Sequence, residues 1–337
     1  MQSTFIPVQR TQLYPAITSQ PTVMPIYVAA KPSNLPFIEA NTKEVEMSHL
    51  TDDCIIPVFS KDNEVTISHQ SFIGTLLEAA QAVFPGESIS DPSIRVSHVV
   101  KGRIPEAIHK PVNQLLESDK TIYYERMMFC FEIPSIYQDI DGSRLSLTVG
   151  GVRAYNEQNL YSKKSPEKFK IFIGFKNMVC CNLCVSTDGY KACLRVMDIQ
   201  AMLSAAEELF RSYDMERHLS LMTAYQNVGM SESQFAQFLG RCRLYQYLPS
   251  AEKKLLPELL LTDTQIGMVA RSYYEDGNFG KNGSDCLSLW RMYNLFTGSN
   301  KASYIDNFLD RAENATAVTT GLARALHGDP EYSWFLG

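Results

Sequence analysis

The alternation of apolar and polar positions in residues 168–185 is the clearest pattern in this chain. One set of alternating positions is apolar at every position but 177, and it comprises Phe169, Ile171, Ile173, Phe175, Val179, Cys181, Leu183 and Val185. The other set includes Lys168, Lys170, Phe172, Lys176 and Asn182. A period of two residues is typical of a β-strand with one buried face. The pattern therefore predicts one long strand whose outer face is basic, partly aromatic and open to solvent.

Three further segments predict strands that pair with this one in a single sheet. They are rich in aromatic and β-branched residues and cover 94–103, 121–133 and 144–156. Asp141-Gly142 predicts the turn between the last two. The apolar positions change phase at Gly150-Gly151, which predicts a β-bulge there. We expect a twisted, mainly antiparallel sheet whose open face is basic.

Helical spacing of apolar residues dominates the second half of the chain. Helices are predicted at 71–84, at 105–117 with an interruption near Pro111, and at 198–227, 234–245, 265–274, 284–296, 303–311 and 315–326. Ser231-Glu-Ser-Gln234 and Thr262-Asp-Thr-Gln265 have the spacing of capping boxes. Because the strands precede the helices, the fold class is predicted to be α+β.

The same patterns divide the chain into three predicted regions. Residues 1–50 contain six prolines and no sustained period, so they are predicted to form an extended arm. Residues 51–190 form the mainly β region with the basic sheet face, beginning with a short strand at 64–69. Residues 191–337 form a helical region that packs on the sheet.

Charge is distributed unevenly along the chain. The 337 residues carry a net charge of -6, which argues against a protein that coats nucleic acid over its whole surface. Between Arg144 and Arg195, nine basic residues against three acidic ones give about +6, which leaves about -12 for the rest. No apolar run is long enough to span a bilayer, and the first residues lack a signal-peptide pattern. We therefore expect a cytoplasmic protein with reduced cysteines and no membrane contact.

Basic and aromatic residues of the predicted sheet are the main candidates for binding. Those expected to contact single-stranded nucleic acid are Arg153, Tyr155, Lys163, Lys164, Lys168, Lys170, Phe172 and Lys176. Lysines would contact phosphates and aromatic rings would stack on bases. Arg241 and Arg243 join this set, although cations at a helix C-terminus also suit the helix dipole. Ordinary solvation of strand charges is the alternative explanation of the basic face.

Other constellations give weaker indications of chemistry. Cys180, Cys181, Cys184 and Cys193 lie on a strand that alternates faces, so they are not predicted to converge on zinc. Asp263, Glu275, Asp276 and Asp285 would bind magnesium or act as acids and bases if the helices brought them together. Helix capping and loop solvation explain them more simply. No catalytic residue, metal site or cofactor is therefore predicted.

Three blocks of sequence carry a family resemblance: 150–185, 234–249 and 289–315. They resemble a family of uncharacterised proteins from Bacteroides-type bacteria, which is similar in turn to a broader group of phage/plasmid-like proteins. In that group a strand ends in Val-Cys-x-Asn and a helix carries Trp-x-x-x-Asn-x-x-Thr. Val179–Asn182 resembles the first pattern, and Trp290, Asn294 and Thr297 resemble the second. The resemblance implies a mobile-element or phage-derived context and no particular activity.

Asn182 and Asn294 are expected to hold a loop or strand by hydrogen bonds rather than to bind a substrate. The leading hypothesis for function is a mobile-element protein that binds single-stranded DNA without catalysis, as an oligomer. One alternative is a protein–protein interaction module, such as a host-defence antagonist or an assembly factor. The other is a metal-dependent nuclease or hydrolase that uses the acidic residues.

Overall fold

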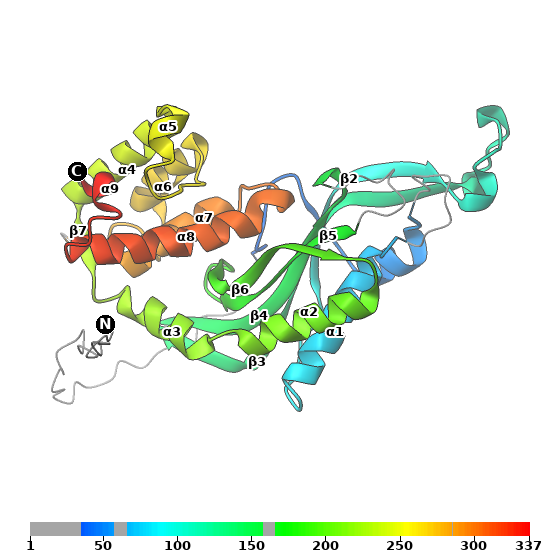
Figure 1. Ribbon diagram of the computed structural model, residues 1–337, viewed down its shortest axis with the longest axis horizontal. Coiled ribbons are helices and arrows are strands. Elements are labelled where there is room, and N and C mark those ends of the chain that lie inside the picture. Colours follow the sequence, from blue (N-terminus) through cyan, green and yellow to red (C-terminus); the bar gives the residue numbers. More distant parts are fainter. Residues whose placement is uncertain (1–34, 57–65, 158–165, 285) are drawn as a thin grey trace, which may run out of the picture. The chain divides into compact units, whose positions relative to one another are not determined.

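Six strands form one antiparallel sheet in the order β1-β2-β3-β4-β5-β6 (Figure 1). They are β1 Lys43–Val45, β2 Ser93–Arg103, β3 Lys120–Ile140, β4 Ser143–Ala154, β5 Glu167–Asn177 and β6 Leu183–Val196. The structure is a computed structural model that describes residues 35–56, 66–157, 166–284 and 286–337. All of these residues belong to one unit, Pro32–Gly337.

Helices make up most of the chain after the sheet, so the predicted α+β class is confirmed. The helices are α1 His69–Val83, α2 Ile199–Ser212, α3 Met215–Ala224, α4 Glu232–Tyr247, α5 Ser250–Lys253, α6 Asp263–Glu275, α7 Leu289–Asn300, α8 Ile305–Leu326 and α9 Ser333–Leu336. A short pair of strands, β7 Gly229–Ser231 and β8 Cys286–Ser288, lies among them. Both predicted capping boxes are confirmed, at the starts of α4 and α6. In the described part of the chain, no helix combines the length and apolar character needed to cross a membrane.

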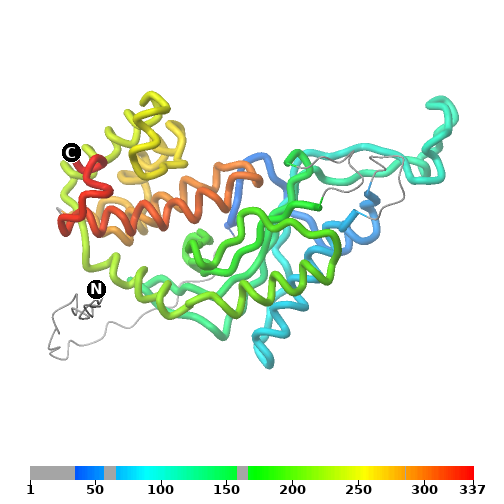
Figure 2. The backbone as a smooth tube through the Cα atoms, viewed as in Figure 1, coloured from blue at the N-terminus to red at the C-terminus, as the bar shows by residue number. Residues whose placement is uncertain are grey.

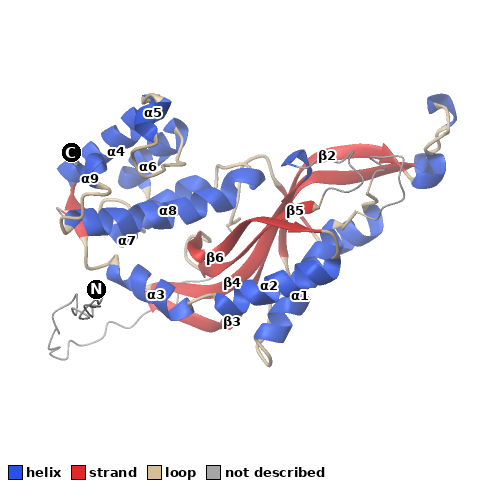
Figure 3. Ribbon diagram, viewed as in Figure 1, coloured by secondary structure: helices blue, strands red, loops and turns tan. Residues whose placement is uncertain are grey.

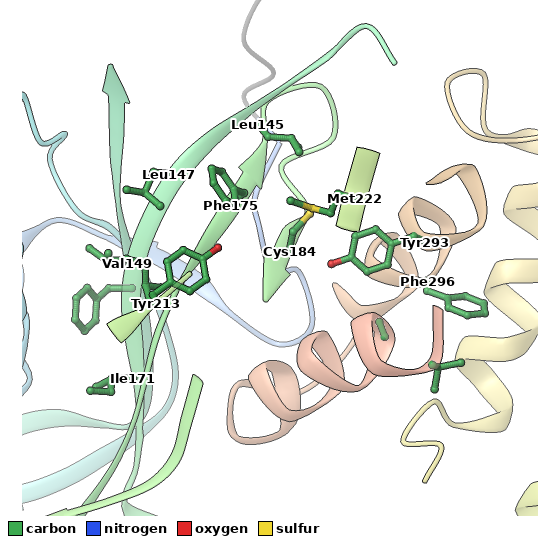
Figure 4. Packing of buried hydrophobic residues seen from close by; sticks show 14 of the residues in the cluster. Leu145, Leu147, Val149, Ile171, Phe175, Cys184, Tyr213, Met222, Tyr293 and Phe296 are labelled. Carbon is green, nitrogen blue, oxygen red and sulfur yellow. The ribbon is translucent and has the colours of Figure 1, made fainter. Parts of the chain in front are cut away.

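One face of the sheet is covered by α1 and α2, which also pack against each other (Figure 3). The apolar positions predicted for β5 lie on this face, and Phe169, Ile171, Ile173 and Phe175 are buried there. Figure 4 shows Ile171 and Phe175 of this cluster together with residues of β4 and with Tyr213. The alternation in β5 therefore identifies the residues of this core face correctly.

The opposite face is also covered, which contradicts the expected open basic face. Phe172, Leu183 and Val185 pack against α8, whose apolar side chains Ile305, Phe308, Leu309 and Ala312 complete a second core. Phe37 and Ile38, from the segment before β1, join the same cluster. Helix α8 contacts β3, β4 and β6. The central part of the sheet is thus buried on both sides, and there its outer face is not available to solvent.

The prediction of one continuous strand over 168–185 is wrong. Strand β5 ends at Asn177, and β6 begins at Leu183 and continues to Val196. The intervening turn is closed by a hydrogen bond of 2.9 Å from the backbone N–H of Asn177 to the carbonyl of Asn182. Cys181 adopts a positive φ of 57°, a conformation that reverses the chain. The hydrophobic period continues through the turn by coincidence, so periodicity alone cannot locate it.

The β-bulge expected at Gly150-Gly151 is also wrong. The register of β3 and β4 is continuous there and shifts instead between Ile133 and Tyr137, where Pro134 interrupts the ladder. The structure requires glycine at position 150 for a different reason. A Cβ atom on it would lie 2.1 Å from the carbonyl oxygen of Phe129, so no larger residue fits between these strands.

Several helix predictions need new boundaries. The interrupted helix at 105–117 consists of three 3₁₀ turns: Pro105–Ala107, Val112–Gln114 and Glu117–Asp119. They form the end of the β2–β3 hairpin, and we call residues 104–119 the tip (Figure 2). The predicted helix at 198–227 divides into α2 and α3, whereas 303–311 and 315–326 merge into α8. Helix α7 begins later than expected, after β8.

The short strand predicted at 64–69 is only partly testable. Residues 64 and 65 lie outside the described residues, and His69 begins α1. Most of the predicted N-terminal arm also lies outside the described residues.

Candidate functional site

The lysines of β5 are paired with carboxylates at or beneath the surface of the sheet. Lys170 Nζ lies 2.8 Å from Asp310 Oδ2 and 3.3 Å from Glu157 Oε1, and it also donates to the carbonyl of Asp306. Lys176 Nζ donates to Glu132 Oε1 at 2.6 Å. Lys168 Nζ lies 2.5 Å from Glu157 Oε2. These charges are paired within the fold. Lys170 and Lys176 are buried, so the expectation that they face solvent is wrong, whereas Lys168 is partly exposed.

Arg153 and its aromatic neighbours are likewise part of the interior. The guanidinium group of Arg153 pairs with Glu167 and lies 4.5 Å from the ring centre of Tyr155 and 4.7 Å from that of Phe169. Arg153, Tyr155 and Phe172 are all buried. The arginine holds the end of β4 to the start of β5. Lys163 and Lys164, the remaining candidates from this region, lie outside the described residues.

His69 stacks on this group at the start of α1. Its ring lies 4.4 Å from that of Tyr123, and its Nε2 is 2.8 Å from the carbonyl oxygen of Tyr124. Burial, assisted by the nearby charge of Arg153, lowers the pKa of His69 to about 3. The imidazole is therefore neutral at physiological pH and acts as a buried aromatic residue.

Asn182 and Asn294 lie at a buried junction between the β5–β6 turn and α7. The side chain of Asn182 donates to the carbonyl of Asn294 at 3.0 Å and to Thr297 Oγ1 at 3.0 Å. Asn294 Oδ1 accepts from Asn177 Nδ2 at 3.0 Å, and its Nδ2 donates to the carbonyl of Trp290 at 2.9 Å. These hydrogen bonds hold the β5–β6 turn against α7.

The cysteines of this region do not converge. Burial raises the pKa of the Cys180 and Cys184 thiols to about 12, which keeps them protonated. Within the residues that the structure describes, no three His, Cys, Asp or Glu side chains are grouped so that they could hold a metal ion.

The acidic candidates around α6 are engaged in local structure. Asp263 Oδ1 pairs with Arg243 Nε at 2.9 Å. Asp276 Oδ1 accepts from the backbone N–H groups of Asn278 and Phe279, both at 2.8 Å, as in an Asx turn. Glu275 is exposed at the end of the helix, and Asp285 lies outside the described residues. Asp263, Glu275 and Asp276, the three that the structure describes, do not form a common cluster.

Arg241 and Arg243 belong to a different surface, the outer side of α4. We call this surface the α4 face: Gln237, Gly240, Arg241, Arg243, Leu244 and Tyr247. These residues line a shallow hollow of about 570 Å³. Leu244 and Tyr247 are 59% and 76% exposed, although both are large and apolar. An exposed apolar hollow of this kind is typical of a binding surface.

The geometry of α4 explains how the hollow forms. Phe235, Phe238, Cys242 and Tyr245 are buried on the inner side of the helix. Gly240 lies on the outer side, where a Cβ atom would meet nothing within 4 Å, and its missing side chain leaves space next to Leu244. Arg241 lies 5.1 Å over the ring of Trp334, so it borders the hollow in a fixed position.

Sequence reasoning identified the two arginines of the α4 face but missed Gly240 and Leu244. A signal was available, because Leu244 and Tyr247 are apolar and lie off the stripe formed by Phe235, Phe238, Cys242 and Tyr245. A surface helix needs only one apolar stripe, so a second one indicates a second contact.

Comparison with known proteins gives a family and no activity. Neither a curated protein nor a solved structure matches the chain. A family model does match residues 18–336, and its description is "Domain of unknown function, B. Theta Gene description (DUF3871)". Because this match covers nearly the whole sequence, the chain belongs to that Bacteroides-named family of unknown function.

Proposed function

We propose that this protein is a protein–protein interaction module whose α4 face binds an acidic segment with exposed apolar side chains. The observation that carries this proposal is the pair Leu244 and Tyr247, exposed beside the hollow at Gly240. Tyrosine and arginine are enriched in the energetically dominant parts of protein interfaces. The α4 face combines both types with an aliphatic side chain.

The charge around the hollow specifies the partner further. Residues 237–256 contain four basic side chains, Arg241, Arg243, Lys253 and Lys254, and one acidic side chain, Glu252, which gives +3, and Asp263, which pairs with Arg243, reduces this to +2. The whole chain has a net charge of -6, so this segment differs in sign from the chain as a whole. Complementary charge favours the approach of an acidic partner and disfavours a basic one.

A protein suits this surface better than a nucleic acid does. Leu244 and Tyr247 are large, apolar and exposed beside the hollow. The exposed leucine side chain has no role in binding a phosphate backbone, whereas it contributes directly to a protein interface.

The mobile-element context suggested by the sequence resemblance is retained as part of the proposal. In that context the partner would be a host-defence protein or a component that the module helps to assemble. Both roles require a stable folded scaffold with one binding surface, and neither requires a reaction.

Site-specific photo-crosslinking in the cells that naturally contain the protein tests the proposal. A photoreactive phenylalanine derivative replaces Tyr247 on the α4 face or, as a control, Tyr137 on β3, which is also exposed. We expect a discrete protein adduct only from position 247, through an acidic segment of the partner. Gly240→Phe fills the hollow and should abolish the adduct, whereas Gly267→Phe should not, because Gly267 is an equally open glycine on α6.

Two outcomes would contradict the proposal. An adduct that nuclease treatment removes would indicate a nucleic-acid ligand, and a labelled single-stranded oligonucleotide should then bind the purified protein in a salt-dependent manner. A pattern of adducts that is the same at positions 247 and 137, or that survives Gly240→Phe, would mean that the α4 face is not a binding surface.

A further inference from the structure

A histidine in the segment that follows β1 lies between a carboxylate and a thiol. His49 Nδ1 is 2.8 Å from Asp53 Oδ2, and His49 Nε2 is 3.8 Å from Cys54 Sγ, within the range of a hydrogen bond that involves sulfur. His49 and Asp53 begin and end one short π-helical turn, and Cys54 is the next residue. Thiol, imidazole and carboxylate in this order form the arrangement of a nucleophile, its base and the group that orients the base.

The carboxylate determines which nitrogen of His49 is basic. An ionised carboxylate can only accept hydrogen bonds, so the proton of the neutral imidazole lies on Nδ1 and is donated to Asp53. Nε2 then carries the lone pair, and Cys54 lies on that side of the ring. Because Asp53 and Cys54 bond to different ring nitrogens, they cannot ligate one metal ion together with His49. The arrangement suits the transfer of a proton.

Strand β3 holds Cys54 beside the imidazole. Cys54 forms a parallel bridge with Ile122, and Thr121 Oγ1 donates to the carbonyl of Ile55 at 2.6 Å. Only 6% of Cys54 is exposed, whereas 26% of the His49 side chain is exposed. The thiol is therefore fixed at the boundary between core and surface, next to a base that solvent reaches.

The Cys54 thiol is protonated at neutral pH. Burial and the charge of Asp53 raise its pKa to about 11, against a smaller opposing effect of Lys43. Such a thiol provides little thiolate, which disfavours exchange with disulfides. It can still act as a nucleophile if a neighbouring base takes its proton during the attack, and the usual targets of this general-base mechanism are acyl groups.

Tyr124 competes with Cys54 for the lone pair of His49. Tyr124 Oη lies 2.9 Å from Nε2, closer than the sulfur of Cys54. With the ring proton on Nδ1, the tyrosine hydroxyl donates to Nε2 and the thiol is the weaker second donor. Removal of this hydroxyl should therefore make the thiol more reactive, whereas removal of the imidazole should make it less reactive.

We propose that Cys54 is a nucleophile that accepts an acyl group from a thioester, with His49 as its general base and Asp53 as the residue that positions the base. His49 Nε2 takes the proton of the thiol while Sγ attacks the acyl carbon. The carbon–sulfur bond of the donor then breaks, and the departing sulfur receives the proton from His49. One thioester forms as another breaks, so the step needs no oxidant or reductant.

A thioester suits this site better than an amide does. The sulfur of a thioester departs as a stable thiolate, whereas an amide also needs an acid for its leaving group and donors for the oxyanion. The inference does not depend on the α4 face, so the two proposals succeed or fail separately.

Acetylation of the full chain by S-phenyl thioacetate, a small thioester, tests the inference at neutral pH. Peptide mapping by mass spectrometry measures the rate at which each cysteine gains an acetyl group. Cys193 and Cys286 are exposed and serve as internal controls for the reagent. We expect Cys54 to be acetylated faster than both, although it is the least accessible of the three.

Substitutions around the imidazole should change this rate in opposite directions. His49→Gln should slow acetylation of Cys54 by about 100-fold or more, because it removes the base. Asp53→Asn should slow it by about tenfold or more, because the ring loses the group that selects its tautomer. Tyr124→Phe should accelerate it by about threefold or more, because Nε2 loses a competing donor. His109→Gln changes an exposed histidine of the tip and should have no effect.

A thiol that only packs beside His49 would react slowly, and at the same rate in the parent and in all the variants, which would overturn the inference. A slower reaction in Tyr124→Phe would also overturn it, because the hydroxyl would then assist the thiol instead of competing with it. Circular dichroism shows whether each variant is folded. If His49→Gln does not fold, Asp53→Asn and Tyr124→Phe still decide the result, because the inference requires their effects to have opposite signs.

Discussion

Lys170 of β5 and Asp310 of α8 form an ion pair, with 2.8 Å between Nζ and Oδ2 and 140 residues between them in sequence. Only 6% of the lysine side chain is exposed. We expect Asp310→Ala to lower the free energy of unfolding by about 3 kcal/mol, because it removes a partner of a buried charge. Urea denaturation measures this as a lower midpoint with an unchanged slope.

Two further variants test whether the loss of stability arises from burial of the charge or from loss of the ion pair alone. Lys170→Met/Asp310→Leu removes both charges and should cost less than Asp310→Ala alone, because no ammonium group is left with an incomplete set of partners. Asp139→Ala breaks the exposed pair between Asp139 and Arg144 and should leave the midpoint almost unchanged. Equal effects of Asp310→Ala and Asp139→Ala would contradict the importance of burial.

The same ion pair illustrates what the sequence could and could not reveal. The period of two correctly places Phe169 and Ile171 on one face of β5 and Lys170 and Phe172 on the other. It does not indicate whether the second face is covered. That depends on α8, which begins at Ile305 and supplies Asp310 from a distant part of the chain. A lysine in a strand has the same local pattern whether solvent or a carboxylate faces it.

The candidate site depends even more on tertiary structure. The positions of Arg241 and Arg243 near the end of α4 follow from helical periodicity, and the capping box at Ser231 fixes where the helix begins. The hollow beside Gly240 exists because, among the described residues, no other element covers this side of α4. The apolar residues Leu244 and Tyr247 indicate a second contact there, but no local pattern shows that the chain itself leaves this side open. The tip was predicted as a helix because Pro105 and the following apolar residues resemble a helix start, whereas Pro111 limits the segment to short turns.

Two buried histidines should make stability depend on pH. Burial lowers the pKa of His69 to about 3 and that of His218 to about 4, from an ordinary value of 6.5. Below pH 6.5 the unfolded chain therefore binds protons that the folded chain does not, and folding becomes less favourable as the pH falls. Each histidine should remove about 1.2 kcal/mol of unfolding free energy between pH 6 and pH 5, close to the limiting slope of about 1.4 kcal/mol per pH unit. Denaturation with urea at pH 5, 6, 7 and 8 measures this slope.

Substitution assigns the slope to particular residues. His69→Gln keeps a donor for the carbonyl of Tyr124 and removes the titrating ring, so the slope between pH 5 and pH 6 should fall by about half. His218→Gln should remove most of the remaining part. His109→Gln changes an exposed histidine of the tip and serves as the matched control. An unchanged slope in both buried variants would mean that other groups cause the pH dependence.

Glycines in this fold should respond to alanine in opposite directions. Gly240→Ala on α4 should raise the free energy of unfolding by about 0.5–1 kcal/mol, because a Cβ atom there meets nothing within 4 Å and alanine favours the helix. Gly150→Ala should lower it by about 2–3 kcal/mol or more, because the new Cβ atom would lie 2.1 Å from the carbonyl oxygen of Phe129. Thermal unfolding measures both. A loss of stability in Gly240→Ala would show that the outer side of α4 is already packed, which would remove the basis of the proposed binding surface.

Asn294 should contribute to stability through the junction with the β5–β6 turn. Asn294→Ala leaves the buried side chain of Asn177 without its 3.0 Å acceptor and removes the bond to the carbonyl of Trp290. An unsatisfied buried amide costs about 1–3 kcal/mol, so we expect a loss of about 2–3 kcal/mol in urea denaturation. Asn307→Ala changes an exposed asparagine of α8 and should have little effect. If the two variants were equally stable, hydrogen bonding at this junction would not explain why the Trp-x-x-x-Asn-x-x-Thr pattern is present, and a binding role for Asn294 would have to be tested instead.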